Sequence, residues 1–168
     1  MCCERIPDLI FMEDYDGDYE KYEAAVYSLY NESFAKERFY WGDKPIRHKK
    51  HPLIKGMSAT FWHIISTGEG QNELPDLRRY ERIAWPAYIM DYCLNCCESL
   101  KVWKNKRKGK HRILMWCEDI DYLVVLEERA EYCVFWTAYP VTWKHTKEGL
   151  QRDYEDYQNK LQKAKTAP

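Results

Sequence analysis

The feature that most constrains the fold is a long apolar stretch at residues 121–141. It reads DYLVVLEERAEYCVFWTAYPV, two segments rich in Val and Tyr on either side of a charged turn at residues 127–131. This pattern predicts an antiparallel hairpin. Apolar residues fall on both faces of each strand, so we expect both strands to be central in a sheet or covered on both sides.

The second predicted strand ends with two hydroxyl side chains. Successive residues of a strand alternate between its faces, so Thr137 and Tyr139 are expected to share a face with Cys133 and Phe135. A hydroxyl pair near a strand end suits the edge of a functional site.

Helical periodicity occurs on both sides of this hairpin in the sequence. Apolar residues recur every three or four positions at residues 18–40 and again at residues 146–165, which predicts an amphipathic helix in each range. Residues 113–117 add another strand. The predicted fold class is α+β, with N-terminal helices packed on an antiparallel sheet of about four strands and a C-terminal helix.

The length of 168 residues favours a single domain. Its expected parts are an N-terminal helical part (1–43), a central core (44–143) and a C-terminal helix (144–168). No apolar run approaches the length of a membrane span, and the N-terminal residues lack a signal-peptide pattern. We therefore expect a cytoplasmic protein with no membrane partner.

Charge is strongly segregated along the chain. Residues 41–112 carry 15 Lys and Arg against 7 Asp and Glu, a net charge of +8, whereas the segments on either side are acidic. A basic middle favours an anionic ligand, nucleic acid above all. The alternative is that the acidic ends neutralise the basic middle within the fold.

Two basic segments are candidates for phosphate contacts. Residues 44–55 contain two prolines and should form an extended arm, and residues 101–112 should form a charged hairpin whose Trp103 stacks on a base. Plain solvated charge is the alternative for both. The candidate residues are Arg47, His48, Lys49, Lys50, Lys55, Trp103, Lys104, Lys106, Arg107 and Lys108.

Proton-transfer chemistry is suggested by His63 inside the apolar run FWHII, which is either a strand or a buried helical turn. A neutral histidine can take or give a proton near neutral pH, but a histidine in such a run is often a core residue. Asp76 is expected to cap a short helix that carries Arg79 and Arg82, whose guanidinium groups suit phosphate oxygens. Glu81 would pair with an arginine or act as a base.

The cysteines resemble half of a zinc site without its second half. Cys93, Cys96 and Cys97 share a helical stripe with Ile89, which favours a place in the core. We expect no metal and no cofactor. Seven cysteines without an evident disulfide framework fit a reducing compartment.

Three segments together resemble a known group of enzymes. The pieces TFWHI, DLRRYERIAWP and YLVVLEERAEYCVFWTAYPV are similar to phage-associated toxin nucleases of the barnase/EndoU/colicin E5–D/RelE-like superfamily, over roughly residues 44–143. The resemblance implies metal-independent cleavage of RNA, with a cognate antitoxin or immunity protein as a further partner. It also implies a site made of a histidine, arginines and a hydroxyl residue of the last strand. The corresponding residues are His63, Arg79, Arg82 and Thr137 or Tyr139, with Glu81 as an addition.

Two other functions stay open at this point. The same basic surface would serve a non-catalytic module that binds RNA or protein, with His63 buried in the core. A metal-dependent enzyme using His48, His51 and the cysteines is the third hypothesis.

Overall fold

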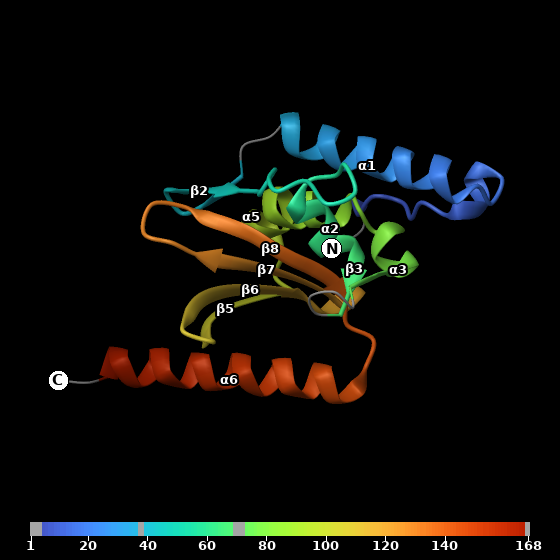
Figure 1. The fold of residues 1–168 in the computed structure, drawn as a ribbon. Coiled ribbons are helices and arrows are strands. Elements are labelled where there is room, and N and C mark those ends of the chain that lie inside the picture. The colour runs from blue at the N-terminus through green and yellow to red at the C-terminus, as the bar shows by residue number, and fades with distance from the viewer. Residues whose placement is uncertain (1–4, 37–38, 69–72, 167–168) are drawn as a thin grey trace.

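The computed structural model describes residues 5–36, 39–68 and 73–166, and has three layers (Figure 1). The middle layer is a six-stranded sheet in the order β1-β2-β8-β7-β6-β5. All neighbouring strands are antiparallel except β2 and β8, which run parallel. The strands are β1 (Tyr40–Trp41), β2 (Lys44–Arg47), β5 (Leu100–Arg107), β6 (Lys110–Cys117), β7 (Tyr122–Glu128) and β8 (Cys133–Pro140).

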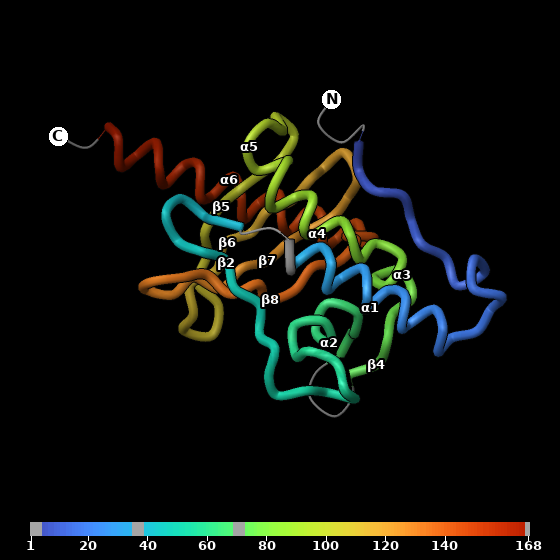
Figure 2. Tube along the Cα trace, turned by 90° about the horizontal axis from the view of Figure 1, so that it is seen from above, coloured from blue at the N-terminus to red at the C-terminus, as the bar shows by residue number. Residues whose placement is uncertain are grey.

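Helices cover both faces of this sheet. Figure 1 shows the N-terminal group above the sheet and α6 below it, and Figure 2 looks down on the N-terminal group. The first group consists of α1 (Tyr19–Lys36), α2 (Ala59–Ile65), α3 (Leu77–Tyr80), α4 (Trp85–Tyr88), the π-helical turn η4 (Ile89–Cys93) and α5 (Leu94–Cys96). The other face of the sheet is covered by the single helix α6 (Lys144–Thr166). A small hairpin of β3 (Ser66–Thr67) and β4 (Leu74–Pro75) follows α2. The described residues also include the 3-10 turns η2 (Met12–Tyr15) and η5 (Glu118–Ile120).

The larger core lies under the N-terminal helices. Tyr22, Val26 and Tyr30 of α1 are fully buried, as the predicted apolar stripe requires. The Tyr30 ring lies 5.2 Å from the ring of Phe61 on α2, and Phe34 stacks on Phe135 of β8 at 5.4 Å. Helix α1 therefore contacts α2 and, at β8, the sheet.

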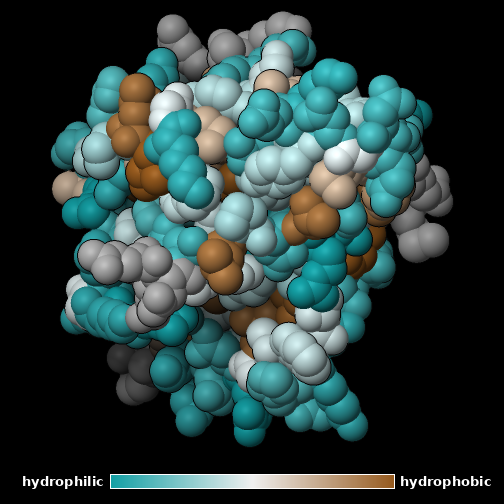
Figure 3. Space-filling view, turned by 45° about the vertical axis from the view of Figure 1, so that its right-hand side comes forward, coloured by the Kyte–Doolittle hydropathy of each residue, from teal (hydrophilic) through white to brown (hydrophobic). Residues whose placement is uncertain are grey.

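A second, smaller core lies under α6. Sheet residues including Trp103, Leu114 and Val125 are buried there against Leu150 and Tyr154 of the helix. Strands β7 and β8 are both central in the sheet, and β7 contributes residues to both cores, which confirms the prediction made from their composition. The face of the molecule in Figure 3 is correspondingly mostly hydrophilic, with its hydrophobic residues in small separate groups. None of the helices within the described residues is long and apolar enough to cross a membrane.

A β-bulge changes the expected side-chain alternation in β8. Val125 pairs with Thr137 but the next residue, Leu126, pairs with Phe135, so Trp136 is an extra residue in the strand. Phe135 consequently faces the larger core, whereas Thr137 and Tyr139 turn to the α6 side. The prediction that they share a face with Phe135 was wrong, because it assumed an uninterrupted strand.

Three further expectations are refined by the structure. The α+β class and the C-terminal helix are confirmed, but the sheet has six strands because the short β1 and β2 extend it beyond β8. The segment around His63 is a helix, which resolves the open alternative. Of the cysteine stripe only Cys93 is buried, while Cys96 is exposed and Cys97 half-buried, because the π-helical turn shifts the helical phase.

Candidate functional site

A cleft of about 880 Å³ opens on the α6 side of the sheet. Its walls come from the end of α2, the β3–β4 hairpin, α3, the sheet strands β5, β6, β7 and β8, and the first half of α6. Four of the residues predicted to be catalytic line it, together with a carboxylate and an indole that the sequence did not indicate. These six are His63, Glu73, Arg79, Trp136, Thr137 and Tyr139.

His63 lines the cleft, whereas the other residues of its helix, α2, are buried in the core. Ser58 caps α2 by accepting a hydrogen bond from the backbone N–H of Phe61, and every other residue of the helix is buried. The His63 side chain is 37% exposed and stacks on Trp136 with the ring centroids 5.7 Å apart. This exposure and position do not fit a core histidine.

Glu73 is the partner of this imidazole. Its Oε1 lies 3.4 Å from His63 Nδ1, and the carboxylate itself is largely buried. A carboxylate only accepts hydrogen bonds, so it favours the tautomer with the proton on Nδ1 and leaves the Nε2 lone pair available. No spacing rule indicated Glu73, because the β3–β4 hairpin brings it back to α2.

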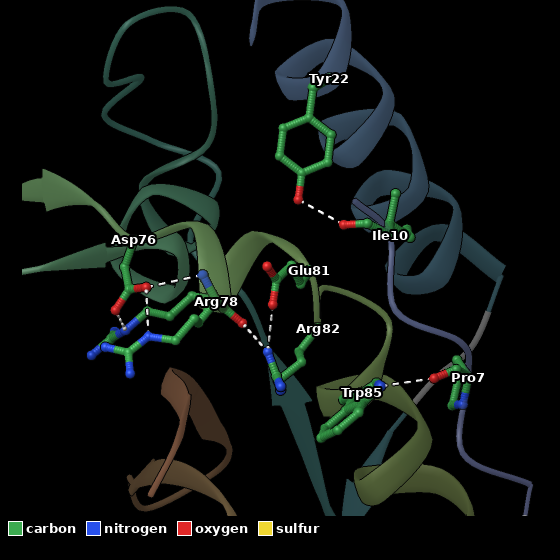
Figure 4. Close-up of polar contacts among 9 residues, drawn as sticks. Pro7, Ile10, Tyr22, Asp76, Arg78, Glu81, Arg82 and Trp85 are labelled. Carbon is green, nitrogen blue, oxygen red and sulfur yellow. Dashed lines mark hydrogen bonds and ion pairs between the residues drawn. The ribbon is translucent and has the colours of Figure 1, made fainter. Parts of the chain in front are cut away.

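Arg79 supplies a cation to the same cleft. Asp76 caps α3 by accepting from the backbone N–H of Arg78 at 3.0 Å, as predicted (Figure 4). Its carboxylate also lies 4.0 Å from Nε of Arg79. The Arg79 side chain is 14% exposed, and its guanidinium lies 5.0 Å from the ring centroid of Tyr139. Burial lowers the pKa of Arg79, with Asp76 acting in the opposite sense, but a guanidinium stays protonated at neutral pH.

The two hydroxyl groups have different surroundings. Burial raises the pKa of Tyr139, and the nearby Arg79 and Arg112 oppose this only in part, so the phenol keeps its proton at neutral pH and can donate it in a hydrogen bond. The Thr137 hydroxyl donates to the backbone carbonyl of His63 at 3.4 Å, which ties β8 to α2.

Glu81 and Arg82, in contrast, do not line the cleft. Arg82 Nη1 donates to Glu81 Oε2 at 2.8 Å and to the Arg78 carbonyl at 2.9 Å, and its guanidinium lies over the ring of Trp85 (Figure 4). The Trp85 indole donates to the Pro7 carbonyl, so this cluster holds the N-terminal segment. Helix α3 ends at Tyr80, so Arg82 lies beyond the helix that carries Arg79.

Three cationic side chains lie around the indole of Trp136. The charged groups of Lys49, Lys110 and Arg112 lie 5.4, 5.3 and 4.8 Å from its ring centroid. Of these only Lys49 was predicted. Strand alternation would have placed Lys110 and Arg112 on one face of β6, but it does not show which face meets a cleft.

The basic hairpin contributes only part of what was expected. Arg107 and Lys108 line the cleft. The other predicted phosphate-contacting residues lie outside its lining: Arg47, His48, Lys49, Lys50, Lys55, Trp103, Lys104 and Lys106. Several have partners elsewhere, since Lys104 pairs with Glu128 and Lys55 lies over Trp62.

Trp103 cannot serve as a stacking platform for a base in this structure. Its side chain is 1% exposed beneath α6, and its indole N–H donates to Asp153 Oδ2 at 2.8 Å. The sequence places Trp103 among lysines, but the helix that covers it begins about forty residues later.

The described residues around this cleft do not form a metal site. Within residues 5–36, 39–68 and 73–166, no group of three or more His, Cys, Asp or Glu side chains is arranged to hold a metal ion. Comparisons of the chain with protein-family models, with curated proteins and with solved structures give no match. An assignment of function therefore depends on the chemistry of the cleft.

Proposed function

We propose that this protein is a metal-independent endoribonuclease that cuts RNA by attack of a ribose 2′-hydroxyl on the adjacent phosphate. The observation that carries the proposal is the His63–Glu73 pair, 3.4 Å apart, in a cleft that also contains Arg79 and Tyr139. An imidazole beside a carboxylate, a guanidinium and a protonated phenol are the groups that this reaction needs, because the nucleophile belongs to the substrate.

The proposed reaction begins at His63. Its Nε2 takes the proton of the 2′-hydroxyl while Glu73 stabilises the imidazolium that forms. The 2′-oxygen bonds to phosphorus and the bond from phosphorus to the 5′-oxygen breaks, which leaves a 2′,3′-cyclic phosphate. Arg79 holds the non-bridging oxygens, and Tyr139 donates a proton to the leaving 5′-oxygen.

The charge of the cleft suits a polyanionic substrate. Its lining has six cationic side chains, Arg79, Arg107, Lys108, Lys110, Arg112 and Arg152, against the three carboxylates of Glu73, Asp153 and Asp156. Neutralised phosphates release counterions, which favours binding at moderate salt. The non-catalytic alternative shares this charge, but it gives no role to the His63–Glu73 pair.

The decisive experiment compares His63→Gln with His111→Gln on a single-stranded RNA. His111 is an exposed histidine of β6 that does not line the cleft. His63→Gln should lose about 10²–10⁴-fold in cleavage rate while still binding RNA, whereas His111→Gln should cleave like the wild type. Products of the wild type should end in a cyclic phosphate, and a 2′-deoxy substitution at the cut should prevent cleavage. A folded His63→Gln protein with the wild-type rate would end the proposal, and binding without any cleavage would favour the non-catalytic module.

A further inference from the structure

Two buried polar atoms on the α6 side of the cleft have no hydrogen-bond partner in the described part of the chain. They are Oδ1 of Asn105 on β5 and Nε of Arg112 on β6. The two residues are direct cross-strand partners, and both line the cleft. An acceptor and a donor are thus buried at neighbouring positions, although each would normally be satisfied.

Both side chains are held in place by other contacts. Asn105 Nδ2 donates to Asp153 Oδ2 at 2.8 Å, and because a carboxylate only accepts, this bond fixes the orientation of the amide. The Arg112 guanidinium lies over Trp136, 4.8 Å from the ring centroid. Neither group can turn to water without giving up a contact, so the pair is preorganised for a ligand that offers a donor beside an acceptor.

A phosphate does not fit this description. It would satisfy Arg112 but would offer no donor to the Asn105 oxygen. It would also meet the carboxylates of Asp153 and Asp156, which line the same side of the cleft from α6. The Watson–Crick or Hoogsteen edge of a nucleobase, in contrast, presents N–H donors beside acceptor atoms.

We propose that Asn105 and Arg112 form a base-reading site that accepts a nucleobase bearing an exocyclic amino group and discriminates against uracil. The inference rests on the proposed function, since it makes RNA the ligand. In adenine and cytosine one amino N–H reaches the Asn105 oxygen, the adjacent ring nitrogen takes the Arg112 N–H, and the second amino N–H is free for an α6 carboxylate. Guanine offers its N1–H and O6 to the same two atoms and turns its amino group to the carboxylate. Uracil has a single ring N–H between two carbonyl oxygens, so one carbonyl must face those carboxylates.

The test is a binding experiment with short 2′-fluoro oligonucleotides, which have no 2′-hydroxyl and cannot be cut by the proposed route. Oligomers of adenine or cytosine should bind the wild type about tenfold or more tightly than oligomers of uracil. Asn105→Ala and Arg112→Lys should each reduce that preference to near onefold. Lys106→Ala, the neighbouring exposed position outside the cleft lining, should retain it.

The outcomes separate this inference from the nuclease proposal. Equal wild-type affinity for all bases, or an unchanged preference in both folded cleft variants, would overturn base reading even if the protein cleaves RNA. A preference that disappears in the variants would support base reading even if no cleavage is found. Arg112→Lys keeps a cation and does not touch the contact of Asn105 with α6, so it remains informative if Asn105→Ala is poorly folded.

Discussion

Replacement of Trp103 tests whether α6 is an integral layer of the fold. The indole is 1% exposed, donates to Asp153 at 2.8 Å and makes an edge contact with Tyr154 at 5.8 Å. Truncation of a buried aromatic residue typically costs about 3–5 kcal/mol, so Trp103→Ala should lower the free energy of unfolding by that amount. Trp103→Phe retains most of the packing and loses a hydrogen bond to a charged group, which is worth roughly 1.5–3 kcal/mol.

The assay is equilibrium unfolding in urea, followed by tyrosine and tryptophan fluorescence. Trp143, which is 67% exposed, provides the matched control, and Trp143→Ala should change the stability by less than about 0.5 kcal/mol. The folded Trp103→Phe protein should bind RNA as the wild type does. A loss below about 1 kcal/mol in Trp103→Ala, or a large fall in RNA affinity in Trp103→Phe with unchanged stability, would refute the buried position and restore the stacking hypothesis.

Two other predictions concern salt and pH. Arg107→Ala should reduce the slope of log affinity against log salt by about 1, because one phosphate contact is lost. Lys106→Ala should change this slope less. Equal slopes for the two variants would remove the hairpin from the RNA-binding surface. Burial, with a smaller effect of Lys50, lowers the pKa of His48 below its usual 6.5, so the unfolded chain takes up a proton before the folded one does. Stability should therefore be complete above about pH 6.5 and fall as the pH drops below it, and a thermal unfolding series should show a weaker dependence in His48→Phe if the reasoning holds.

Local patterns predicted the elements of this fold better than their arrangement. The helix at residues 19–36, the terminal helix and the hairpin of β7 and β8 follow from periodicities of 3.6 and 2 residues, which are properties of neighbouring positions. The addition of β2 to the edge of β8 is a parallel pairing between residues far apart in the chain. Nothing in the local composition of residues 44–47 specifies that partner.

For the candidate site, too, the sequence indicated single residues but not the contacts between elements. His63, Arg79 and Tyr139 were identified because their side-chain chemistry is distinctive, and the structure brings all three to one cleft. Glu73 and Asn105 were missed because their significance depends on a partner from another element. Residue type indicates what a side chain can do, whereas tertiary packing decides what it meets.

The bulge at Trp136 decides which residues of β8 face the cleft. If the strand ran through the same residues without a bulge, Thr137 and Tyr139 would face the apolar core beneath the N-terminal helices, and Ala138 would lie beside Arg79. Deleting Trp136 itself would make Phe135 and Thr137 consecutive opposite Leu126 and Val125, so Thr137 and Tyr139 would keep their present face. The extra residue therefore adds to the cleft the indole on which His63 stacks, without displacing the two hydroxyl residues.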